Sequence, residues 1–207
     1  MKKVLLTAVC MAFAVAASAQ TFEKVKELEI ITTGGSIDVT AVKGKTTSVN
    51  VSALDAKHCT TEVRQDNERE LKIKISKKTP ASVCKPNIIV TTQAKVPVEI
   101  DAMDTQIVLN GLEKAINLDI KNSQAKLSAI AGSLDIEAKA STVVAEGKIK
   151  KLDIEGNGSN IQTVWTKKPG SKSIELEGSN NVMMAFPAGT KKVPVKQGEF
   201  TGNLVIQ

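Results

Sequence analysis

A short apolar–acid–apolar triplet recurs five times in the second half of this sequence, and it constrains the fold more than any other feature. The copies are VEI at Val98, LDI at Leu118, Leu134 and Leu152, and IEL at Ile174, with starts 20, 16, 18 and 22 residues apart. Another apolar residue follows the end of each triplet after six or seven positions, and the residues between them are polar or small. Each unit therefore predicts a strand, a tight corner and a second strand.

A period near 18 residues is typical of a β-solenoid, because one strand–corner–strand unit cannot bury its own apolar face. Stacked units can bury it, since the backbone of each unit pairs with its neighbours at a spacing of about 4.8 Å. An antiparallel meander is the alternative, and the regular corner spacing favours the solenoid. The predicted inward residues form two columns, Val98, Leu118, Leu134, Leu152, Ile174 and Ile100, Ile120, Ile136, Ile154, Leu176.

The residues before the repeat also alternate between apolar and polar positions, as in SIDVTAV from Ser36, ELKIKIS from Glu70 and NIIVTT from Asn87. This period of two is that of strands, so the whole chain is predicted to be all-β. We expect a signal peptide over 1–19, a less regular β-rich half or cap over 20–96, and the solenoid over 97–207. The final segment GEFTGNLVIQ is predicted to form a capping strand.

The N-terminus has the features of a secretory signal peptide. Lys2 and Lys3 precede an apolar stretch, and the small-residue signal ASA ends at Ala19. A lipoprotein signal at Cys10 is the alternative, but Val9 occupies a position where such signals have a small residue. Export to the periplasm, the cell surface or the medium is expected. No later apolar run reaches the roughly 20 residues of a transmembrane helix.

Two cysteines, Cys59 and Cys84, remain after cleavage of that peptide. In an oxidising compartment two cysteines most simply form one disulfide, which is our prediction. A metal site that includes His58 is the alternative, but the sequence offers too few ligands and no CxxC pair. A Cys–His dyad is disfavoured, because adjacent residues on a strand point to opposite faces.

The charge balance argues against a nucleic-acid partner. The chain has 28 Lys and Arg against 22 Asp and Glu, a net +6, and loss of Lys2 and Lys3 leaves +4 without a dense basic cluster. The glycine pair after Thr33 lacks the lysine and the following helix of a phosphate-binding loop. No nucleophile elbow is present, and His58 is the single histidine. We therefore expect no catalytic residues, no metal and no cofactor.

The middle residue of each triplet is predicted to point outward, which would place one carboxylate on every unit. Like charges about 4.8 Å apart repel by nearly 1 kcal/mol even in water. A solvated face threaded with lysines is the simpler interpretation, and a strip that binds cations is the alternative. This predicted surface ladder consists of Glu99, Asp119, Asp135, Asp153 and Glu175.

The second strand of each unit offers another outward column, predicted as Val108, Ser128, Val144, Gln162 and Met183. Its apolar members Val108, Val144 and Met183 are candidate contacts for another protein, unless the N-terminal half covers them. Trp165 is a further candidate contact. A single tryptophan is more often buried as a plug, because its large surface favours burial.

The chain resembles the exported bacterial "putative adhesin" domains of unknown function, which are related to adhesin-like β-solenoids of auto-transporter head domains. The resemblance rests on the glycine-led strand pair TTGGSIDVTAVKGKTTSVNVSA from Thr32, on LKIKIS and NIIVTTQAKVPVEIDA, and on the repeated units. The chain departs from the family at its corners, which read NS, AS, GS and SN. The resemblance implies a β-solenoid and an adhesion role, and it supplies no catalytic residues.

Two functional hypotheses follow from these features. The first is a non-catalytic, adhesin-like binding module of the cell envelope or surface that acts through its outer faces, with a protein or an envelope polymer as partner. The second is a structural protein that self-assembles through the ends or edges of the solenoid, which would present unpaired strands. A carbohydrate-active β-helix enzyme is a residual alternative, disfavoured because the repeats contain one aromatic residue, Trp165.

Overall fold

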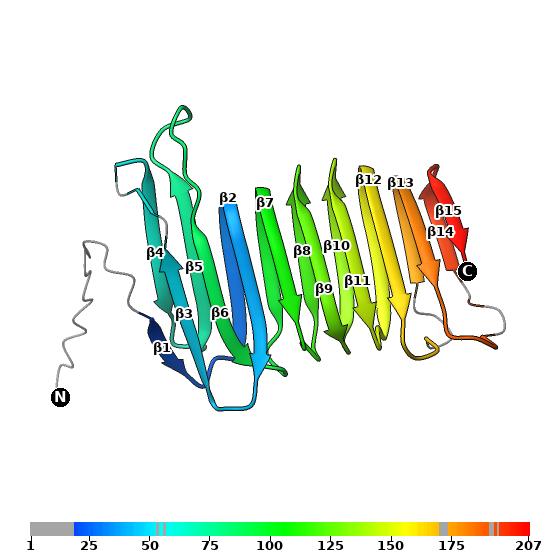
Figure 1. Cartoon of the computed structure of the whole chain (residues 1–207), viewed down its shortest axis with the longest axis horizontal. Helices are drawn as coiled ribbons and strands as arrows, with labels where there is room; N and C mark the ends of the chain where they lie inside the picture. The colour runs from blue at the N-terminus through cyan, green and yellow to red at the C-terminus, as the bar shows by residue number, and fades with distance from the viewer. Residues whose placement is uncertain (1–18, 53, 56, 170–173, 191–192, 194) are drawn as a thin grey trace, which may run out of the picture.

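The structure, a computed structural model, describes residues 19–52, 54–55, 57–169, 174–190, 193 and 195–207, and these residues form an all-β fold without helices. The predicted signal peptide lies outside the described residues except for Ala19. Within the described part of the chain there is accordingly no helix that could cross a membrane. The strands stack side by side into one elongated body, with the N-terminal and C-terminal strands at opposite ends (Figure 1).

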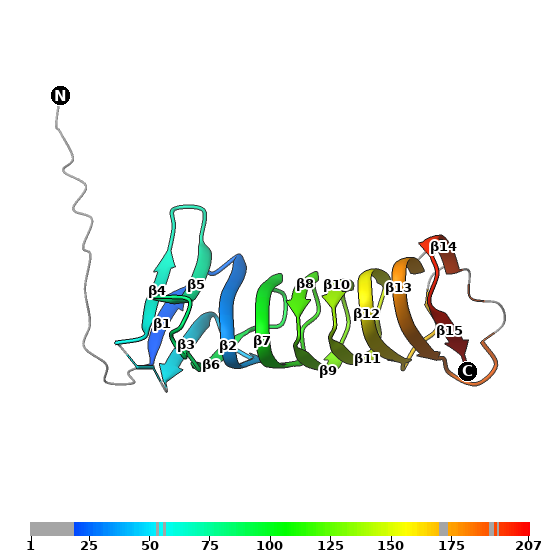
Figure 2. The same ribbon diagram turned by 90° about the horizontal axis from the view of Figure 1, so that it is seen from above.

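The fifteen strands differ widely in length, and the four longest bend from one side of the body to the other (Figure 2). The strands are β1 (Gln20–Glu23), β2 (Glu27–Val42), β3 (Thr46–Ser52), β4 (Cys59–Gln65), β5 (Glu70–Lys77), β6 (Asn87–Gln93), β7 (Val98–Asn110), β8 (Ile116–Lys121), β9 (Gln124–Ile130), β10 (Ser133–Lys139), β11 (Thr142–Gly147), β12 (Lys151–Trp165), β13 (Ile174–Ala185), β14 (Val195–Phe200) and β15 (Asn203–Ile206).

Six parallel strands form a closed ring of pairings in the order β7, β8, β10, β12, β11 and β9. The ring closes because β7 and β12 each contribute to both sides of the body. The first half of β7 pairs with β8 and its second half pairs with β9. Further strands extend the sheet beyond β7 on one side and beyond β12 on the other.

The register corrects the predicted alignment of the units. Val98 pairs with Ile116 rather than Leu118, and Ile116 in turn pairs with Leu134. From Val98 to Leu152 the chain therefore repeats every 18 residues, since 116 − 98, 134 − 116 and 152 − 134 are all 18. The triplet LDI was a poor marker of register, because a shift of two residues along a strand leaves every side chain on the same face.

The predicted core residues are buried although their columns differ from the prediction. All ten expose 3% of their surface or less, and Leu118 lies in the column of Ile100 and Ile136. Aliphatic side chains from the two sides of the body meet in one continuous core. Burial of a side chain of this size contributes about 1.5–3 kcal/mol, so the stacked aliphatic columns are the main source of stability.

A ladder of buried hydroxyl groups lines the inside of the corner. The backbone N–H of Thr105 donates to Ser123 Oγ, that of Ser123 to Ser141 Oγ, and that of Ser141 to Ser159 Oγ, each at 3.1 Å. The hydroxyls of Ser123 and Ser141 donate in turn to the carbonyls two residues earlier, at 2.8 and 2.9 Å. Asn180 continues the ladder by accepting from the Ser159 N–H at 3.1 Å. The ladder satisfies backbone donors that the turning chain buries.

The residue before each hydroxyl has a left-handed backbone conformation. The φ angles are 55° at Asp104, 50° at Asn122, 51° at Ala140 and 69° at Gly158. Asn, Asp and Gly adopt this conformation readily, whereas Ala does so at a cost of about 1–2 kcal/mol. The corners that read NS, AS and GS are therefore a left-handed residue followed by a buried hydroxyl.

The N-terminal half adds to the same stack in an order that differs from the chain order. Strand β2 pairs in parallel with β7 over Leu28–Thr40, so the stacked part begins before the first triplet. On its other side β2 pairs in parallel with β5 and β6, which come later in the sequence. Strands β1, β3 and β4 then pair antiparallel, β3 on β6, β4 on β5 and β1 on β3.

The predicted disulfide between Cys59 and Cys84 is confirmed, with Cα atoms 5.6 Å apart. It joins the start of β4 to the loop that links β5 and β6. That loop crosses the corner of β2 at Gly34 and Gly35, where the φ angles are 82° and 85°. A Cβ atom on Gly35 would lie 2.0 Å from the Pro86 carbonyl oxygen, so the glycine pair permits this close approach.

At the other end of the stack, β14 and β15 each pair with β13 alone among the described strands. They continue the two sides of the body, β14 beside the first half of β13 and β15 beside the second half. Leu204 and Ile206 continue the inward columns of Val182 and Met184. Ile206 is nevertheless 50% exposed, because no described strand lies beyond it.

Removal of one hydroxyl from the corner ladder is expected to destabilise the fold. In Ser141→Ala the buried N–H of Ser123 loses its acceptor, which costs about 1–3 kcal/mol of unfolding free energy. Urea unfolding measures the change. Ser133→Ala, at a half-buried position on β10, is the matched control and should change stability by less than about 0.5 kcal/mol. Equal effects of the two variants would contradict a structural role for the ladder.

A glycine at the strained corner residue Ala140 is expected to stabilise the fold. Ala140→Gly removes the left-handed penalty of alanine and should raise the unfolding free energy by up to about 1 kcal/mol, less the entropy that glycine adds to the unfolded chain. Ala138→Gly, at a buried strand position two residues away, should lower it. Thermal and urea unfolding of both variants test the assignment, and a loss of stability in Ala140→Gly would refute it.

Candidate functional site

The two sides of the stack present surfaces of different character. One side consists of β5, β8, β10, β14 and the first halves of the long strands. The other consists of β6, β9, β11, β15 and the second halves. We call the first the acidic face and the second the stripe face. Because strand side chains alternate in direction, every second residue on each face points to solvent.

The acidic face carries the predicted carboxylates, but in two columns rather than one. Asp119 is displaced from the predicted ladder, since Asn117 pairs with Glu99 and Asp135 in its place. The displacement follows from the two-residue shift in register. The first column is Glu29, Glu99, Asn117, Asp135, Asp153 and Glu175, and the second is Asp101, Asp119, Glu137 and Glu155.

Lysines close both ends of the first acidic column. Lys72 pairs with Glu29 in register and its Nζ lies 2.5 Å from a Glu29 carboxylate oxygen. At the other end Lys196 pairs with Glu175 and forms an ion pair with it. Within the face Lys139 contacts Glu137 at 2.7 Å. Lysines therefore form ion pairs with several carboxylates of the acidic face.

The carboxylates in the middle of the columns are electrostatically unfavourable. Burial raises the pKa of Asp135, the neighbouring Asp153 raises it further, and Lys151 opposes the shift. Burial likewise raises the pKa of Asp119, with a further contribution from Glu137. No cluster of three or more His, Cys, Asp or Glu suited to a metal ion occurs among the described residues.

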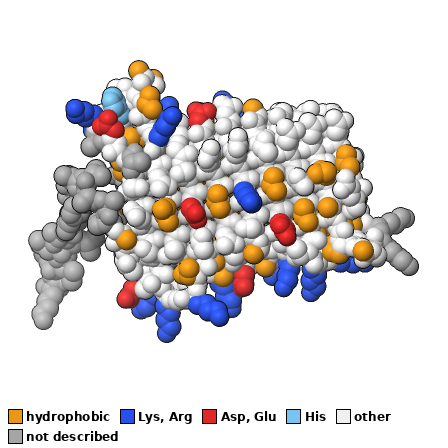
Figure 3. Space-filling model, viewed as in Figure 1, with side chains coloured by type: hydrophobic (Ala, Val, Ile, Leu, Met, Phe, Trp, Pro, Cys, Tyr) orange, Lys and Arg blue, Asp and Glu red, His pale blue; other side chains and the backbone are white. Residues whose placement is uncertain are grey.

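The stripe face is nearly free of charge and exposes a regular row of aliphatic side chains. Figure 3 shows this row as orange side chains separated by isolated red and blue ones. We call it the stripe and define it by residues that pair successively in register. The stripe is Ile89, Asp38, Val108, Lys126, Val144, Gln162, Met183 and Val205.

The predicted contacts Val108, Val144 and Met183 thus lie in one column, but Ser128 does not. Lys126 occupies the place predicted for Ser128, which pairs with Asn110 one column away. The cause is again the two-residue shift in this unit. Val108 and Val144 expose 41% and 37% of their surface, so the N-terminal half leaves them uncovered.

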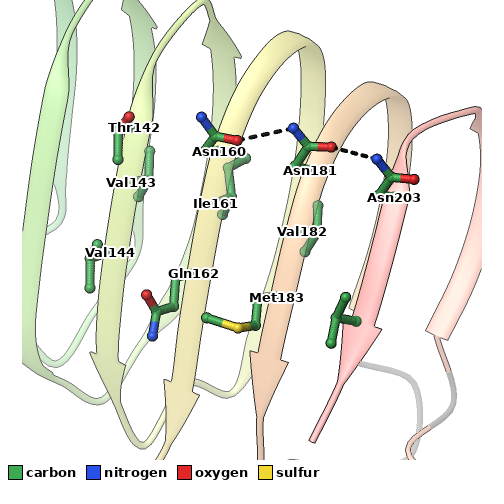
Figure 4. Close-up of a pocket in the computed structure, with 11 residues that line it drawn as sticks. Thr142, Val143, Val144, Asn160, Ile161, Gln162, Asn181, Val182, Met183 and Asn203 are labelled. Atoms are coloured by element: carbon green, nitrogen blue, oxygen red, sulfur yellow. Dashed lines mark hydrogen bonds between the residues drawn. The ribbon is translucent and has the colours of Figure 1, made fainter.

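A second column of amide and hydroxyl side chains runs beside the stripe, and sequence reasoning missed it. We call it the amide column. The Asn181 amide nitrogen donates to Asn160 Oδ1 at 3.0 Å, and that of Asn203 donates to Asn181 Oδ1 at 2.9 Å (Figure 4). Four of its members, Gln106, Gln124, Thr142 and Asn160, recur at intervals of 18 residues, so the corrected spacing would have revealed them. The column is Asn87, Ser36, Gln106, Gln124, Thr142, Asn160, Asn181 and Asn203.

Two shallow grooves lie along the stripe and the amide column. One, of about 250 Å³, lies over β11, β12, β13 and β15 and includes Val144, Met183 and Val205 (Figure 4). The other, of about 480 Å³, lies over β7, β9 and β11 and includes Val108 and Lys126. Each groove combines aliphatic side chains on one edge with hydrogen-bonding side chains on the other. Such a surface suits a partner that lies across several strands.

Trp165 is part of the core rather than an exposed contact. It is 3% exposed, its Nε1–H donates to the Ile149 carbonyl at 3.1 Å, and its ring stacks on Phe186 with centroids 4.6 Å apart. It is the last residue of β12.

Sequence reasoning also missed a grouping of Asp55, His58 and Ser82 beside the disulfide. His58 Nδ1 lies 3.4 Å from Ser82 Oγ, and Nε2 lies 3.7 Å from Asp55 Oδ2. Ser82 is buried, and its hydroxyl is engaged with Thr79 Oγ1 at 2.8 Å. A nucleophile must be reachable by substrate and closely bonded to its base. These contacts instead hold the loop around Cys84 in place.

Neutralising the central carboxylate of the acidic face is expected to stabilise the fold. Asp135→Asn removes repulsion from Asp153 and should raise the unfolding free energy by about 0.5 kcal/mol at pH 7. The gain should shrink as pH falls through the raised pKa of Asp135, because protonation then removes the same charge from the wild type. It should also shrink in high salt. Glu146→Gln, an exposed carboxylate on the stripe face, is the control, and an equal gain there would contradict the assignment.

No protein-family model and no curated protein sequence matches this chain. Among solved structures it is similar to a "putative cell adhesion protein" from Clostridium sporogenes, with 12% identity, a TM-score of 0.42, and coverage of 93% of this chain and 100% of that one. A "putative adhesin" from Parabacteroides merdae shares 16% identity at a TM-score of 0.39, with coverage of 92% and 95%.

A "putative adhesin" from Bacteroides fragilis is similar at 13% identity and a TM-score of 0.39, with coverage of 94% of this chain and 98% of that one. Likenesses at this distance carry no argument about this chain. Its function has to be inferred from its own surface.

Proposed function

We propose that this chain is an exported, non-catalytic binding module of the cell envelope or surface, adhesin-like in action and a β-solenoid in architecture. The observation that carries the proposal is the stripe, a row of exposed aliphatic side chains on a face nearly without charge. Five of its eight residues are apolar, and four of these, Ile89, Val108, Val144 and Val205, are exposed. A row of exposed apolar side chains of this kind marks a site of contact with a partner.

The register of the strands supports the solenoid. Successive parallel strands pair residue by residue at offsets of 18 residues, and the inward positions of one strand lie over those of the next. The corner ladder repeats with the same period. A stacked array of this kind exposes long, flat faces that extended partners can cover.

The contrast between the two faces supports binding through the stripe. On the acidic face, charged side chains hold water and oppose desolvation. The stripe holds two charges, Asp38 and Lys126, among its eight residues. It crosses eight strands, about 34 Å at a spacing of about 4.8 Å. The amide column beside it offers both donors and acceptors. The apolar row therefore provides contact area, and hydrogen bonds to the amides orient the partner.

The disulfide supports export. Structural disulfides persist in oxidising compartments, so Cys59–Cys84 agrees with the signal peptide predicted over 1–19. The shallow, aromatic-poor grooves favour adhesion over chemistry, since an enzyme site is normally concave and brings together titratable groups. The partner is inferred to be a protein or a polymer of the envelope.

A charge placed on the stripe is expected to weaken binding to the envelope. Mature protein is mixed with isolated cell envelopes and the bound fraction is measured by co-sedimentation. Met183→Lys introduces a charge between Gln162 and Val205, and it should weaken binding at least about tenfold. Glu155→Lys, on the acidic face, is the matched control with retained binding. Equal binding by Met183→Lys and wild type would refute the stripe as the site.

A further inference from the structure

We propose that the stripe recognises a second copy of this chain, through a two-fold symmetric contact centred on Val108. The inference rests on the proposed function, because it names one partner of the proposed binding face. It follows from the order of charges along the stripe, where Asp38 and Lys126 flank Val108 on the two neighbouring strands.

The symmetry can be followed on the strands. A half-turn about an axis along β7, lying in the plane of contact, brings the stripe faces of two copies together and reverses the order of the strands. Asp38 of one copy then lies opposite Lys126 of the second, and the reverse pair forms at the same time. A symmetric dimer needs such a self-complementary patch.

The apolar residues match under the same operation. Val108 lies opposite itself on the axis, and Ile89 lies opposite Val144 of the second copy. All three are exposed in the single chain, at 41%, 41% and 37%. Facing sheets pack about 10 Å apart, a distance that aliphatic side chains from both sides fill. The contact would bury these side chains and place the two ion pairs on either side of the axis.

The amide column is also compatible with this contact. Because the axis runs along the strands, the amide column of one copy faces that of the other. Gln106 lies opposite itself and Ser36 lies opposite Gln124 of the second copy. Amides and hydroxyls both donate and accept, so like groups can bond to each other. No pair of like charges is brought together within the stripe.

The size of the contact predicts a weak, reversible dimer. The five strands that carry Ile89 to Val144, each about seven residues long, cover roughly 24 by 23 Å, or about 550 Å² per copy. Stable complexes bury about 800 Å² per partner, so the dimer should form in a concentration-dependent way. At the rim of the contact the half-turn sets Gln162 opposite Asn50 of the second copy, which pairs with Ile89 on β3. Met183 and Val205 lie beyond this rim and stay free for another partner.

Sedimentation velocity of the purified mature chain between about 1 µM and 1 mM tests the dimer. The wild type should shift from monomer to dimer over this range. Lys126→Asp and Asp38→Lys should each weaken association at least about tenfold, because each sets like charges opposite one another. The double variant with both substitutions should restore the dimer, since the two charges exchange places. Circular dichroism and melting curves show whether each variant is folded.

Val144→Lys and Met183→Lys separate this contact from the rest of the stripe. Val144→Lys should abolish the dimer, whereas Met183→Lys lies outside the contact and should leave it intact. A wild type that stays monomeric to about 1 mM, or a double variant that fails to restore association, overturns the proposal. Association that survives Val144→Lys but is lost in Ile206→Asp also overturns it, by placing the contact at the open edge of β15.

Envelope binding distinguishes the two proposals. A wild type that binds envelopes but stays monomeric would refute self-recognition and leave the proposed binding function standing. Loss of envelope binding in Met183→Lys with the dimer retained would support both.

Discussion

The stacking of one corner on the next is the constraint on which the rest of the structure depends. A chain that turns sharply inside a narrow body buries backbone N–H groups that no neighbouring strand can reach. In this protein a serine hydroxyl from the following unit accepts the N–H of Thr105, Ser123 and Ser141. The Asn180 amide oxygen accepts that of Ser159. Since each hydroxyl serves the unit before it, the corners have to lie directly above one another. The flat faces and their straight columns follow from that alignment.

Much of the fold could be predicted from sequence, because burial of one face makes apolar and polar residues alternate along each strand. This alternation is visible in the sequence of a single strand. The aliphatic residues of the triplets are all in the core, and Cys59 and Cys84 form the expected disulfide. The register of the second unit was wrong, since Ile116 rather than Leu118 pairs with Val98. Alternation cannot detect a shift of two residues. The hydroxyls at 105, 123, 141 and 159 recur at intervals of 18 and carry the missing information.

The wrong register of the second unit also led to wrong predictions of the surface columns. With the shifted register the acidic ladder contained Asp119, and the outward column of the second strand contained Ser128. The structure replaces them with Asn117 and Lys126. Lys126 is the residue that makes the stripe self-complementary, so the candidate contact could not be recognised before the register was known. The amide column was missed because its members are ordinary polar residues until they are aligned.

The position of β2 between β7 on one side and β5 with β6 on the other has a consequence for the order of folding. From β7 to β13 each strand pairs with one about 18 to 22 residues away, so this part can grow by short steps along the chain. Strand β2 can complete its pairing only after β7 on one side and β5 and β6 on the other have been synthesised. The N-terminal end of the stack is thus completed by a later segment, and the disulfide anchors the loop that brings this segment across the corner of β2.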